Sequence, residues 1–364
     1  MGTLRVNLKQ EIDSSYDIRI GTGMFEGLVK GLGDNPIAYS YVIITDSNVK
    51  ALYGEKLKEL LDGISDKTLL LDFPAGEKQK NREIKATIED SMLEAGFGRD
   101  SAVIALGGGV VGDLAGYIAA TYTRGVPYIQ VPTTLVACVD SSIGGKTAVD
   151  TPHGKNLIGS FYQPEEVIID VNTLKTLGPE EIREGLAEVI KYGIIADYEL
   201  FELIEERCDD IFALDIELLS TIIEKCCRIK GDVVENDEKE SNLRKILNFG
   251  HTIGHAIENH SNYTLTHGNS ISIGMMLEGR IAVNLGIWNE EGLERIKSLF
   301  MKAGLPVELP FDIDPEKLIS SMRIDKKSRG GVIEMCLPEA IGKIYRIDGK
   351  YALKIDDRTI REIF

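Results

Sequence analysis

The segment that decides the fold is Ser101-Ala-Val-Ile-Ala-Leu-Gly107-Gly108-Gly109-Val-Val-Gly112-Asp113-Leu-Ala-Gly116. It has the pattern of a short β-strand, a glycine-rich turn and a helix start. Gly107, Gly109 and Gly112 fit the spacing G-x-G-x-x-G, in which missing side chains let backbone N–H groups approach a pyrophosphate at a helix N-terminus. The segment therefore predicts a nucleotide site on an α/β sheet. A tight turn with a helix cap is the alternative interpretation.

Working outward, β-rich runs alternate with stretches compatible with helices, at Tyr41–Asp46, Thr68–Phe73, Ser101–Leu106 and Tyr128–Val131. This alternation is typical of βαβ units on a mainly parallel sheet. After Gly178-Pro179 the pattern becomes helical, as in Glu180–Ile195, Ile216–Glu235 and Ile271–Leu285. We expect a Rossmann-like nucleotide-binding α/β domain over residues 1–178 and a mostly α-helical domain over 179–364. The default ligand site is the cleft between them.

Length, composition and charge agree with two globular domains and exclude several classes of partner. The chain has 364 residues, of which 43% are hydrophobic and 27% charged, so it needs no disulfide or metal to fold. A formal net charge of −17 repels nucleic-acid phosphates and acidic membrane surfaces. The five cysteines show no C-x-x-C spacing, and no signal peptide or long apolar span is visible. We expect reduced thiols, a cytoplasmic location, and no nucleic-acid or membrane partner.

The residue that binds the ribose of the predicted nucleotide must lie at an unusual position in the sequence. The acidic residue that normally follows the glycine turn by about 20 positions is absent, because that region is Tyr128-Ile-Gln-Val-Pro132. Asp46 and Asn48 follow the strand that ends at Thr45. Ligands bind beyond the carboxyl ends of strands in open α/β sheets, so these two residues are the candidates.

Histidines are clustered, with His251, His255, His260 and His267 falling within 17 positions. If residues 248–259 form a helix, His251 and His255 share one face because they are four positions apart. Extended backward, this face also carries Arg244 and Asn248, which makes a polar stripe.

Two imidazoles and a carboxylate are a common ligand set for a catalytic zinc, which keeps a position open for substrate. The predicted helix Glu180–Ile195 supplies Glu184, Glu188 and Lys191 on its polar face. The alternative is a solvated helix face and two histidines satisfied within the fold.

The segment from Pro132 to Gly159 combines small residues with Asp140, Lys146, Lys155 and Asn156. Such a loop can surround an anion with backbone N–H groups and ammonium charges. Gly144-Gly145-Lys146-Thr147 lacks the first glycine of a Walker-type phosphate loop at the required spacing. A flexible surface loop is the alternative, but it does not explain why the polar residues coincide.

Taken together, these strings resemble the 3-dehydroquinate synthase family of sugar-phosphate cyclases along nearly the whole chain. The strings that carry the resemblance are Gly-Gly-Gly-Val-Val-Gly-Asp113, Arg124-Gly-Val-Pro-Tyr-Ile-Gln-Val-Pro-Thr-Thr134, Asp140-Ser-Ser-Ile-Gly-Gly-Lys146, Gly-Lys-Asn156-Leu-Ile-Gly, Ala-Glu188-Val-Ile-Lys191-Tyr-Gly and Asn248-Phe-Gly-His251-Thr-Ile-Gly-His255. One departure is Asn269, which stands where a glutamate usually follows His-Gly.

The resemblance implies residue roles. The metal, Zn²⁺ or Co²⁺, would be bound by Glu188, His251 and His267, with His255 left for hydrogen bonding and proton movement. The NAD contacts would be Asp46, Asn48, Glu77, Lys80, Gly108, Gly109, Asp113, Thr133, Thr134 and Thr176, with Lys146 and Lys155 beside them. The substrate phosphate would be held by Lys146, Asn156, Asn248 and His255, the carboxylate by Arg244 and Lys326, and the hydroxyl groups by Asp140, Lys191 and Lys230. Arg124 would reach the site of a second subunit, which implies a homodimer.

The resemblance also implies the reaction, namely conversion of 3-deoxy-arabino-heptulosonate 7-phosphate to 3-dehydroquinate and phosphate in the shikimate pathway. NAD⁺ would oxidise the substrate transiently and be regenerated in each turnover. Three alternatives stay open: a sister cyclase acting on another sugar phosphate, a metal-dependent polyol dehydrogenase that releases NADH, and a binding protein without turnover. Arg244 favours the 3-dehydroquinate reaction over a sister cyclase, because a neutral aldose does not need a carboxylate-binding arginine.

Overall fold

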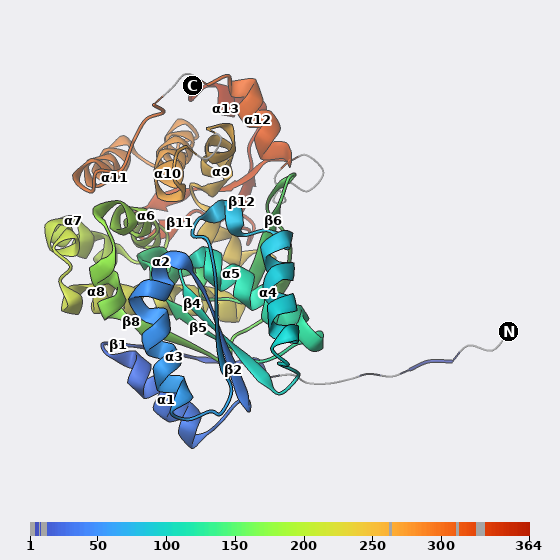
Figure 1. The fold of residues 1–364 in the computed structure, drawn as a ribbon. Helices are drawn as coiled ribbons and strands as arrows, with labels where there is room; N and C mark the ends of the chain where they lie inside the picture. Colours follow the sequence, from blue (N-terminus) through green and yellow to red (C-terminus); the bar gives the residue numbers. More distant parts are fainter. Residues whose placement is uncertain (1–3, 7, 9–12, 262–263, 311–312, 325–331) are drawn as a thin grey trace.

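The computed structural model describes residues 4–6, 8, 13–261, 264–310, 313–324 and 332–364. The first half is built on a six-stranded sheet of order β1-β8-β5-β4-β2-β3 in which all neighbours are parallel (Figure 1). The strands are β1 Asp17–Gly21, β2 Ser40–Asp46, β3 Thr68–Phe73, β4 Ser101–Gly107, β5 Tyr128–Pro132 and β8 Glu166–Asp170. The four predicted strands are confirmed, and β1 and β8 extend one edge of the sheet.

Helices cover both faces of this sheet, as its buried strands require. On one face, α1 (Met24–Asp34) and α3 (Glu55–Asp62) pack against residues such as Ile43 and Ile104. On the other face, α4 (Arg82–Glu94) and α5 (Gly109–Thr121) pack against Val42 and Val103. Neighbouring residues of one strand thus serve different cores, which is why β2 and β4 are apolar almost throughout.

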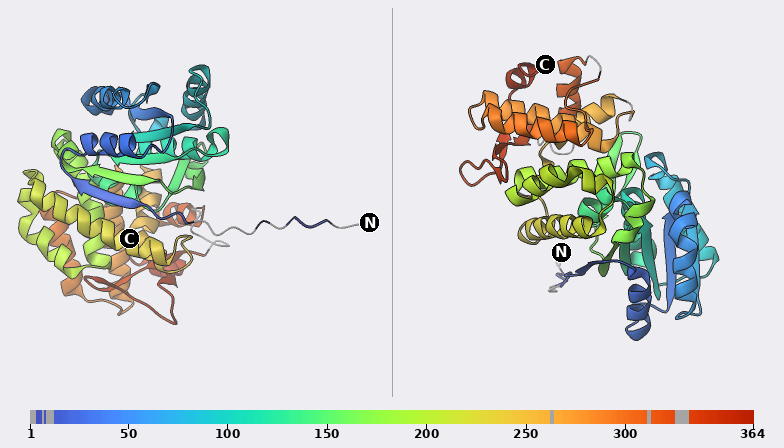
Figure 2. Two further views of the ribbon diagram at one scale, coloured as in Figure 1. Left: turned by 90° about the horizontal axis from the view of Figure 1, so that it is seen from below. Right: turned by 90° about the vertical axis from the view of Figure 1, so that its left-hand side faces the viewer.

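The second half is mostly helical, as predicted, and lies beyond the carboxyl ends of β4 and β5 (Figures 1 and 2). Its helices are α6 Pro179–Ile195, α7 Tyr198–Phe212, α8 Ile216–Asn236, α9 His251–His260, α10 His267–Asn284, α11 Glu290–Lys302, α12 Pro315–Ile324 and α13 Asp357–Arg361. Two small antiparallel pairs, β9 (Glu334–Cys336) with β12 (Ala352–Lys354) and β10 (Pro338–Ala340) with β11 (Lys343–Ile344), accompany them. Pro179 begins α6 at its first position, followed by acidic residues that suit a helix N-terminus.

The largest apolar core joins the two halves. Leu135, Val139 and Val167 from the first half pack with helical residues such as Leu186 and Ile223. The division at residue 178 stays a prediction. None of the helices among the described residues is both long and apolar enough to cross a membrane.

The segment predicted as an anion-binding loop has more regular structure than expected. Residues Ala137–Ser141 form a short helical turn, and Lys146–Thr151 (β6) pairs antiparallel with Gly154–Phe161 (β7). The loop interpretation is therefore wrong for residues 146–161, which form a hairpin. The remaining short elements are α2 (Ser47–Val49) and helical turns at Lys50–Gly54, Glu77–Gln79, Tyr122–Arg124, Val171–Thr176 and Leu243–Asn248.

A candidate metal and nucleotide site between the two halves

The glycine-rich turn forms the strand, turn and helix start that its sequence predicts. β4 ends at Gly107, and α5 begins at Gly109 with no side chain capping its N-terminus. A Cβ on Gly107 would lie 2.5 Å from Val111, and one on Gly112 would lie 2.8 Å from Gln130. Only glycine allows this close packing, which leaves the N–H groups of the first helical turn available to a ligand.

Asp46 and Asn48 lie at the neighbouring strand end. β2 and β4 are adjacent, with Ile44 opposite Ala105, and the chain continues from β2 to β3 on one side and from β4 to β5 on the other. Such a reversal of strand order marks the ligand crevice of open α/β sheets. The Asp46 carboxylate accepts hydrogen bonds from the N–H groups of Asn48 (2.8 Å) and Val49 (3.1 Å).

A buried ammonium group organises the polar side of this crevice. Lys80 Nζ lies 2.9 Å from a Glu77 oxygen, 3.2 Å from Asp113 and 3.9 Å from Asp150, and we call these four residues the lysine cluster. Burial would lower the pKa of Lys80, but the three carboxylates raise it above its usual range. The pKa of Asp113 rises to about 6, because its burial outweighs the attraction of Lys80.

The threonines predicted to contact NAD differ in their surroundings. Thr133 is buried and its hydroxyl has no hydrogen-bond partner among the described residues. Thr134 accepts a hydrogen bond from the Ala137 N–H (3.2 Å), and its side chain lies against the glycine turn. Thr176 lies farther along the chain, where its hydroxyl is 2.8 Å from that of Tyr53. Among the three, Thr133 is therefore the one whose hydroxyl makes no hydrogen bond to the described residues.

Across from this crevice, three side chains of the helical half converge. Glu188 of α6 lies 3.3 Å from His251 Nε2 and 3.0 Å from His267 Nε2, both measured to its Oε1 atom. We call these three residues the imidazole cluster; their potential ligand atoms all lie within 4.8 Å of one another. Glutamate and two imidazoles match the donor set of a catalytic zinc with one position open, so the residues fit such an ion.

The electrostatics of the imidazole cluster follow from its burial. Burial would raise the pKa of Glu188, but Lys191, which forms an ion pair with it, and His251 hold that pKa well below its usual range. Burial would lower the pKa of His267, yet Glu188 and Glu258 raise it to about 10. The cluster thus gathers positive charge around a single carboxylate.

Helix positions decide between the two candidate carboxylates of α6. Glu184 accepts hydrogen bonds from the Gly268 N–H (2.7 Å) and the Thr266 hydroxyl, so it caps the N-terminus of α10. Glu188, one helical turn later, faces the two imidazoles. Glu188 is thus the carboxylate of the cluster, and Glu184 is structural.

The predicted polar stripe is partly wrong. The helix begins only at His251, because Gly250 adopts a left-handed conformation with φ 78° and residues Leu243–Asn248 form a separate helical turn. Arg244 and Asn248 therefore reach the site from a different element. His251 and His255 do share a face of α9, with ring centroids 5.2 Å apart.

Arg244 is buried and holds two backbone segments together. Its guanidinium donates to the carbonyls of Glu238 (2.6 Å) and Gly144 (3.0 Å). Its Nε atom is buried without a hydrogen-bond partner among the described residues. A buried donor of this kind costs free energy unless a ligand accepts its hydrogen bond, which suits a carboxylate.

Asp140 is a second, half-buried carboxylate of the site. Lys230 of α8 donates to it at 2.8 Å and Tyr192 of α6 donates at 2.6 Å. Lys230 also lowers the pKa of Asp140 against the effect of burial, while the burial of Lys230 lowers the pKa of that lysine. Asp140 and Lys230 are therefore brought together as predicted, and sequence reasoning missed Tyr192.

Two predicted phosphate-binding residues, Lys146 and Asn156, lie on the β6–β7 hairpin. Glu240, a second residue that sequence reasoning missed, connects Lys146 with the predicted Asn248. Glu240 forms an ion pair with Lys146 and accepts a hydrogen bond from Asn248 (2.6 Å). Asn156 lies on β7 with φ 54°, a conformation that asparagine tolerates, and its N–H donates to Asp150. Glu240 carries no signal in the sequence, because this residue lies in an acidic run that has the pattern of solvated surface.

Two predicted residues stand apart from this group. Arg124 lies in the turn after α5 with φ 78°, next to Thr123 with φ 48°, a strained pair for residues other than glycine. Lys326 lies outside the described residues. Their predicted roles stay predictions.

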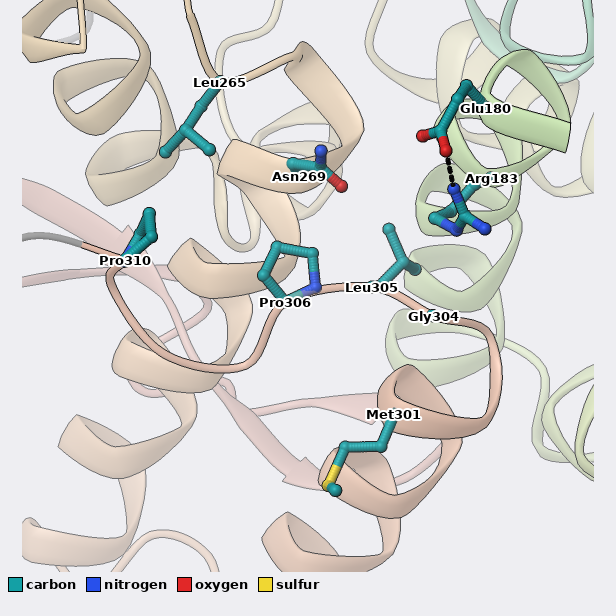
Figure 3. A pocket seen from close by; sticks show the side chains of 9 residues that line it. All are labelled: Glu180, Arg183, Leu265, Asn269, Met301, Gly304, Leu305, Pro306 and Pro310. Carbon is teal, nitrogen blue, oxygen red and sulfur yellow. Dashed lines mark ion pairs between the residues drawn. The ribbon is translucent and has the colours of Figure 1, made fainter.

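The departure at Asn269 lies on the outer side of the site. Asn269 lines an open hollow of about 570 Å³ beside the ion pair of Glu180 with Arg183, whose N–O distance is 2.6 Å (Figure 3). His267 instead has Glu188 and Glu258 as its carboxylate neighbours. The ring of His267 therefore has polar support that does not depend on residue 269.

Fold and site together define a class of protein in which a doubly wound sheet with a nucleotide-type turn faces a helical metal centre. Two solved sugar-phosphate cyclases share this architecture. One is 2-deoxy-scyllo-inosose synthase complexed with carbaglucose-6-phosphate, NAD⁺ and Co²⁺, at 27% identity and TM-score 0.86 over 95% of each chain. The other is 2-epi-5-epi-valiolone synthase from Streptomyces hygroscopicus with NAD⁺ and Zn²⁺ bound, at 28% identity and TM-score 0.87 over 99% of this chain and 98% of that one.

The chain belongs to the 3-dehydroquinate synthase family. Residues 70–184 match the family model of the 3-dehydroquinate synthase N-terminal part, and residues 185–328 match that of the C-terminal part. The chain is 46% identical over 345 residues to 3-dehydroquinate synthase of Desulforamulus reducens, which is 94% of this chain and 95% of that protein. The family predicted from the sequence strings is confirmed.

Proposed function

We propose that this chain is a 3-dehydroquinate synthase, a phosphate-eliminating lyase that uses NAD and a divalent metal, Zn²⁺ or Co²⁺. It converts 3-deoxy-arabino-heptulosonate 7-phosphate to 3-dehydroquinate and phosphate. The observation that carries this proposal is the convergence of Glu188, His251 and His267 opposite a glycine-rich nucleotide turn. Membership of the family and the cofactors named for the two solved cyclases support it.

The substrate is a flexible dianion, and the site is matched to it group by group. The buried Arg244 Nε, which has no partner among the described residues, offers a hydrogen bond to the carboxylate. Lys146 and Asn248, held side by side by Glu240, offer positive charge and an amide donor to the phosphate. Asp140 and Lys230 offer an acceptor and a donor to hydroxyl groups. This arrangement binds and orients the substrate before any bond changes.

Metal and NAD together would supply a polarised substrate hydroxyl and a hydride acceptor that later returns the hydride. Glu188, His251 and His267 would hold the metal, while Lys191 keeps Glu188 ionised and so able to ligate. His255, half-buried beside His251, is placed for hydrogen bonding and proton movement. With Asn248 it would hold the phosphate so that a phosphate oxygen takes the proton as the C–O bond breaks.

The proposal extends to assembly and location. We assign Arg124 to the site of a second subunit, because a strained arginine at an exposed turn is typical of a residue kept for function. The active form is then a homodimer in the cytoplasm. A mixture of an Arg124→Ala variant with a variant that lacks His251 tests this assignment. Arg124 acts across the interface if every mixed dimer regains one intact site, and it acts within its own subunit if no mixed dimer regains activity.

The decisive assay follows phosphate and 3-dehydroquinate when the protein is incubated with the heptulosonate phosphate, NAD⁺ and Zn²⁺. We expect one phosphate per 3-dehydroquinate and no growth of absorbance near 340 nm, since NADH is reoxidised in each turnover. Deuterium at the oxidised carbon should be retained in the product, because a closed site excludes exchange with water.

Other results point to the alternatives. Turnover of glucose 6-phosphate without turnover of the heptulosonate identifies a sister cyclase. Stoichiometric NADH release identifies a polyol dehydrogenase. Binding without any turnover identifies a non-catalytic protein.

A further inference from the structure

Glu258 is a buried carboxylate of α9 that neither the sequence prediction nor the proposed mechanism uses. It is 5% exposed and lies beside His267, with its Oε2 atom 3.8 Å from the ring atom Nδ1. The other ring nitrogen, Nε2, faces Glu188 at 3.0 Å. The imidazole of His267 thus lies between two carboxylates, one at each nitrogen.

The second oxygen of Glu258 has a different partner. Lys155 of β7 donates to Oε1 at 2.7 Å. The same Lys155 lies 3.6 Å from Glu77, which belongs to the lysine cluster. An ammonium group therefore fixes Glu258 in place and links it to the nucleotide side of the site.

Two geometric readings of Glu258 are possible, because its carboxylate, His255 and His267 also have ligand atoms within 4.8 Å of one another. In the first, Glu258 is itself a metal ligand. In the second, it supports His267 from behind while Glu188 and His251 share the metal with that residue. The distances favour the second, because Glu188 Oε1 lies 3.3 and 3.0 Å from the Nε2 atoms of His251 and His267, whereas Glu258 Oε2 lies 3.8 Å from His267 Nδ1.

We propose that Glu258 is a positioning residue that fixes the ring orientation and tautomer of His267, so that Nδ1 carries the proton and Nε2 faces the metal. The inference rests on the proposed function, because it needs a metal at the imidazole cluster. Ligating histidines commonly donate their other N–H to a carboxylate, which orients the ring and makes it a stronger ligand. Lys155, which donates a hydrogen bond to Glu258, would position His267 indirectly by holding the Glu258 carboxylate in place.

The test measures metal affinity, without reference to turnover. The variants Glu258→Gln, Glu258→Asp and Lys155→Met are compared with wild type by competition of Zn²⁺ with a chromophoric chelator. The same proteins loaded with Co²⁺ give a visible spectrum that reports ligand geometry. Glu294→Gln on α11 is the matched control, because it makes the same chemical change at an exposed carboxylate that belongs to neither cluster.

We expect Glu258→Gln to weaken Zn²⁺ binding about 10- to 100-fold and to shift the Co²⁺ spectrum, as changes behind a ligating histidine do. Glu258→Asp should recover part of the affinity, Lys155→Met should have a smaller effect in the same direction, and Glu294→Gln should have none. Circular dichroism of each variant checks that it is folded, and Glu258→Asp provides a second variant if Glu258→Gln does not fold.

Three results would overturn the inference in distinguishable ways. If wild type binds no metal, the proposed function fails and the inference fails with it. If wild type binds Zn²⁺ and Glu258→Gln binds it within twofold with an unchanged Co²⁺ spectrum, only the positioning role fails. If Glu258→Gln abolishes binding while His251→Ala retains it, Glu258 is a ligand and the metal lies on the other side of His267.

Discussion

The lysine cluster and the imidazole cluster each bring opposite charges together around a buried residue, Lys80 or Glu188, but they are built in opposite ways. In the lysine cluster one ammonium lies among three carboxylates, at 2.9, 3.2 and 3.9 Å. In the imidazole cluster one carboxylate lies among two imidazoles and the ammonium of Lys191. The first surrounds one cation with carboxylates, whereas the second presents metal-ligand atoms within 4.8 Å of one another.

This difference separates structural charge from charge arranged for a ligand. Lys80 also shapes the backbone, because its carbonyl accepts a hydrogen bond from the Asp150 N–H at 2.7 Å and so ties the β6–β7 hairpin to the sheet. No comparable backbone bond is made by the Glu188 carboxylate among the described residues. Removing the Lys80 ammonium would leave its carboxylate neighbours uncompensated and should change folding stability, whereas substitutions in the imidazole cluster should change ligand binding.

The largest expected effect is on metal binding. We expect elemental analysis to find about one divalent ion per chain in wild type, and His251→Ala should remove it, with a loss of affinity beyond the roughly 100-fold typical of residues behind a ligand. The exposed His153→Ala is the matched control and should keep one ion per chain. Full metal content and full activity in His251→Ala would refute the assignment of the cluster.

The next effect is on stability. Lys80→Met leaves three carboxylates without their ammonium, so the free energy of unfolding in urea should fall by about 3–5 kcal/mol. Lys50→Met, which removes a solvent-accessible ion pair with Asp72, should have a much smaller effect, because water screens such a pair. Equal losses in the two variants would mean that the lysine cluster is no more structural than a surface pair.

Arg244 combines a structural role with a ligand-binding role, because it donates to backbone carbonyls and keeps one donor for a ligand. Arg244→Met should weaken binding of the carboxylate-bearing substrate by about 2–5 kcal/mol and leave NAD⁺ binding nearly unchanged. Calorimetric titration with each ligand measures both, and Lys245→Met on the same turn is the control. An equal loss of both affinities would instead indicate general unfolding.

The smallest effect concerns Asp237, which ends α8 and accepts hydrogen bonds from the N–H groups of Ser241 (2.7 Å), Asn242 (2.7 Å) and Arg244 (3.0 Å). Despite burial, these bonds lower its pKa to about 2. A lowered pKa stabilises the fold above the ordinary value near 4, and this contribution is lost as the pH falls through 2. It amounts to about 2 kcal/mol.

Asp237→Asn should therefore be less stable than wild type at pH 5 and should approach it as the pH falls, in urea titrations at each pH. For Asp113, the contribution to stability depends on pH with the opposite sign. Its pKa is raised to about 6, so its contribution is present below pH 4 and lost as the pH rises through 6. Asp113→Asn should gain on wild type as the pH rises through this range. Parallel pH profiles for the two variants would contradict both assignments.

The sequence predicted the parts of the fold in which local pattern and burial agree. β2, β4 and α6 have apolar periodicity and clear boundary residues, and they were predicted to within one or two residues. The β6–β7 hairpin was missed because β7 mixes small, polar and apolar residues without the period-two alternation of a strand, and half of β7 is exposed. β1 was missed because its pairing with β8 joins residues almost 150 positions apart, which no local pattern records.

The candidate site was predicted in the same uneven way. His251, His267 and Glu188 are brought together, but the identification of Glu188 over Glu184 came from the family resemblance and needed the fold to be explained. The polar stripe failed at Gly250, where a left-handed turn ends one element before α9 begins. Glu240 and Glu258 became visible only through their contacts, since acidic residues are common on surfaces and these two carry no spacing signal.

The ion pairs between the halves also have a consequence for how the chain folds. Lys146 meets Glu240, Lys155 meets Glu258 and Lys230 meets Asp140 across 94, 103 and 90 positions of sequence. During synthesis, the β6–β7 hairpin and Asp140 therefore leave the ribosome well before their partners exist. Because contacts of long sequence separation form slowly, we expect the ion pairs that complete the candidate site to form late in folding.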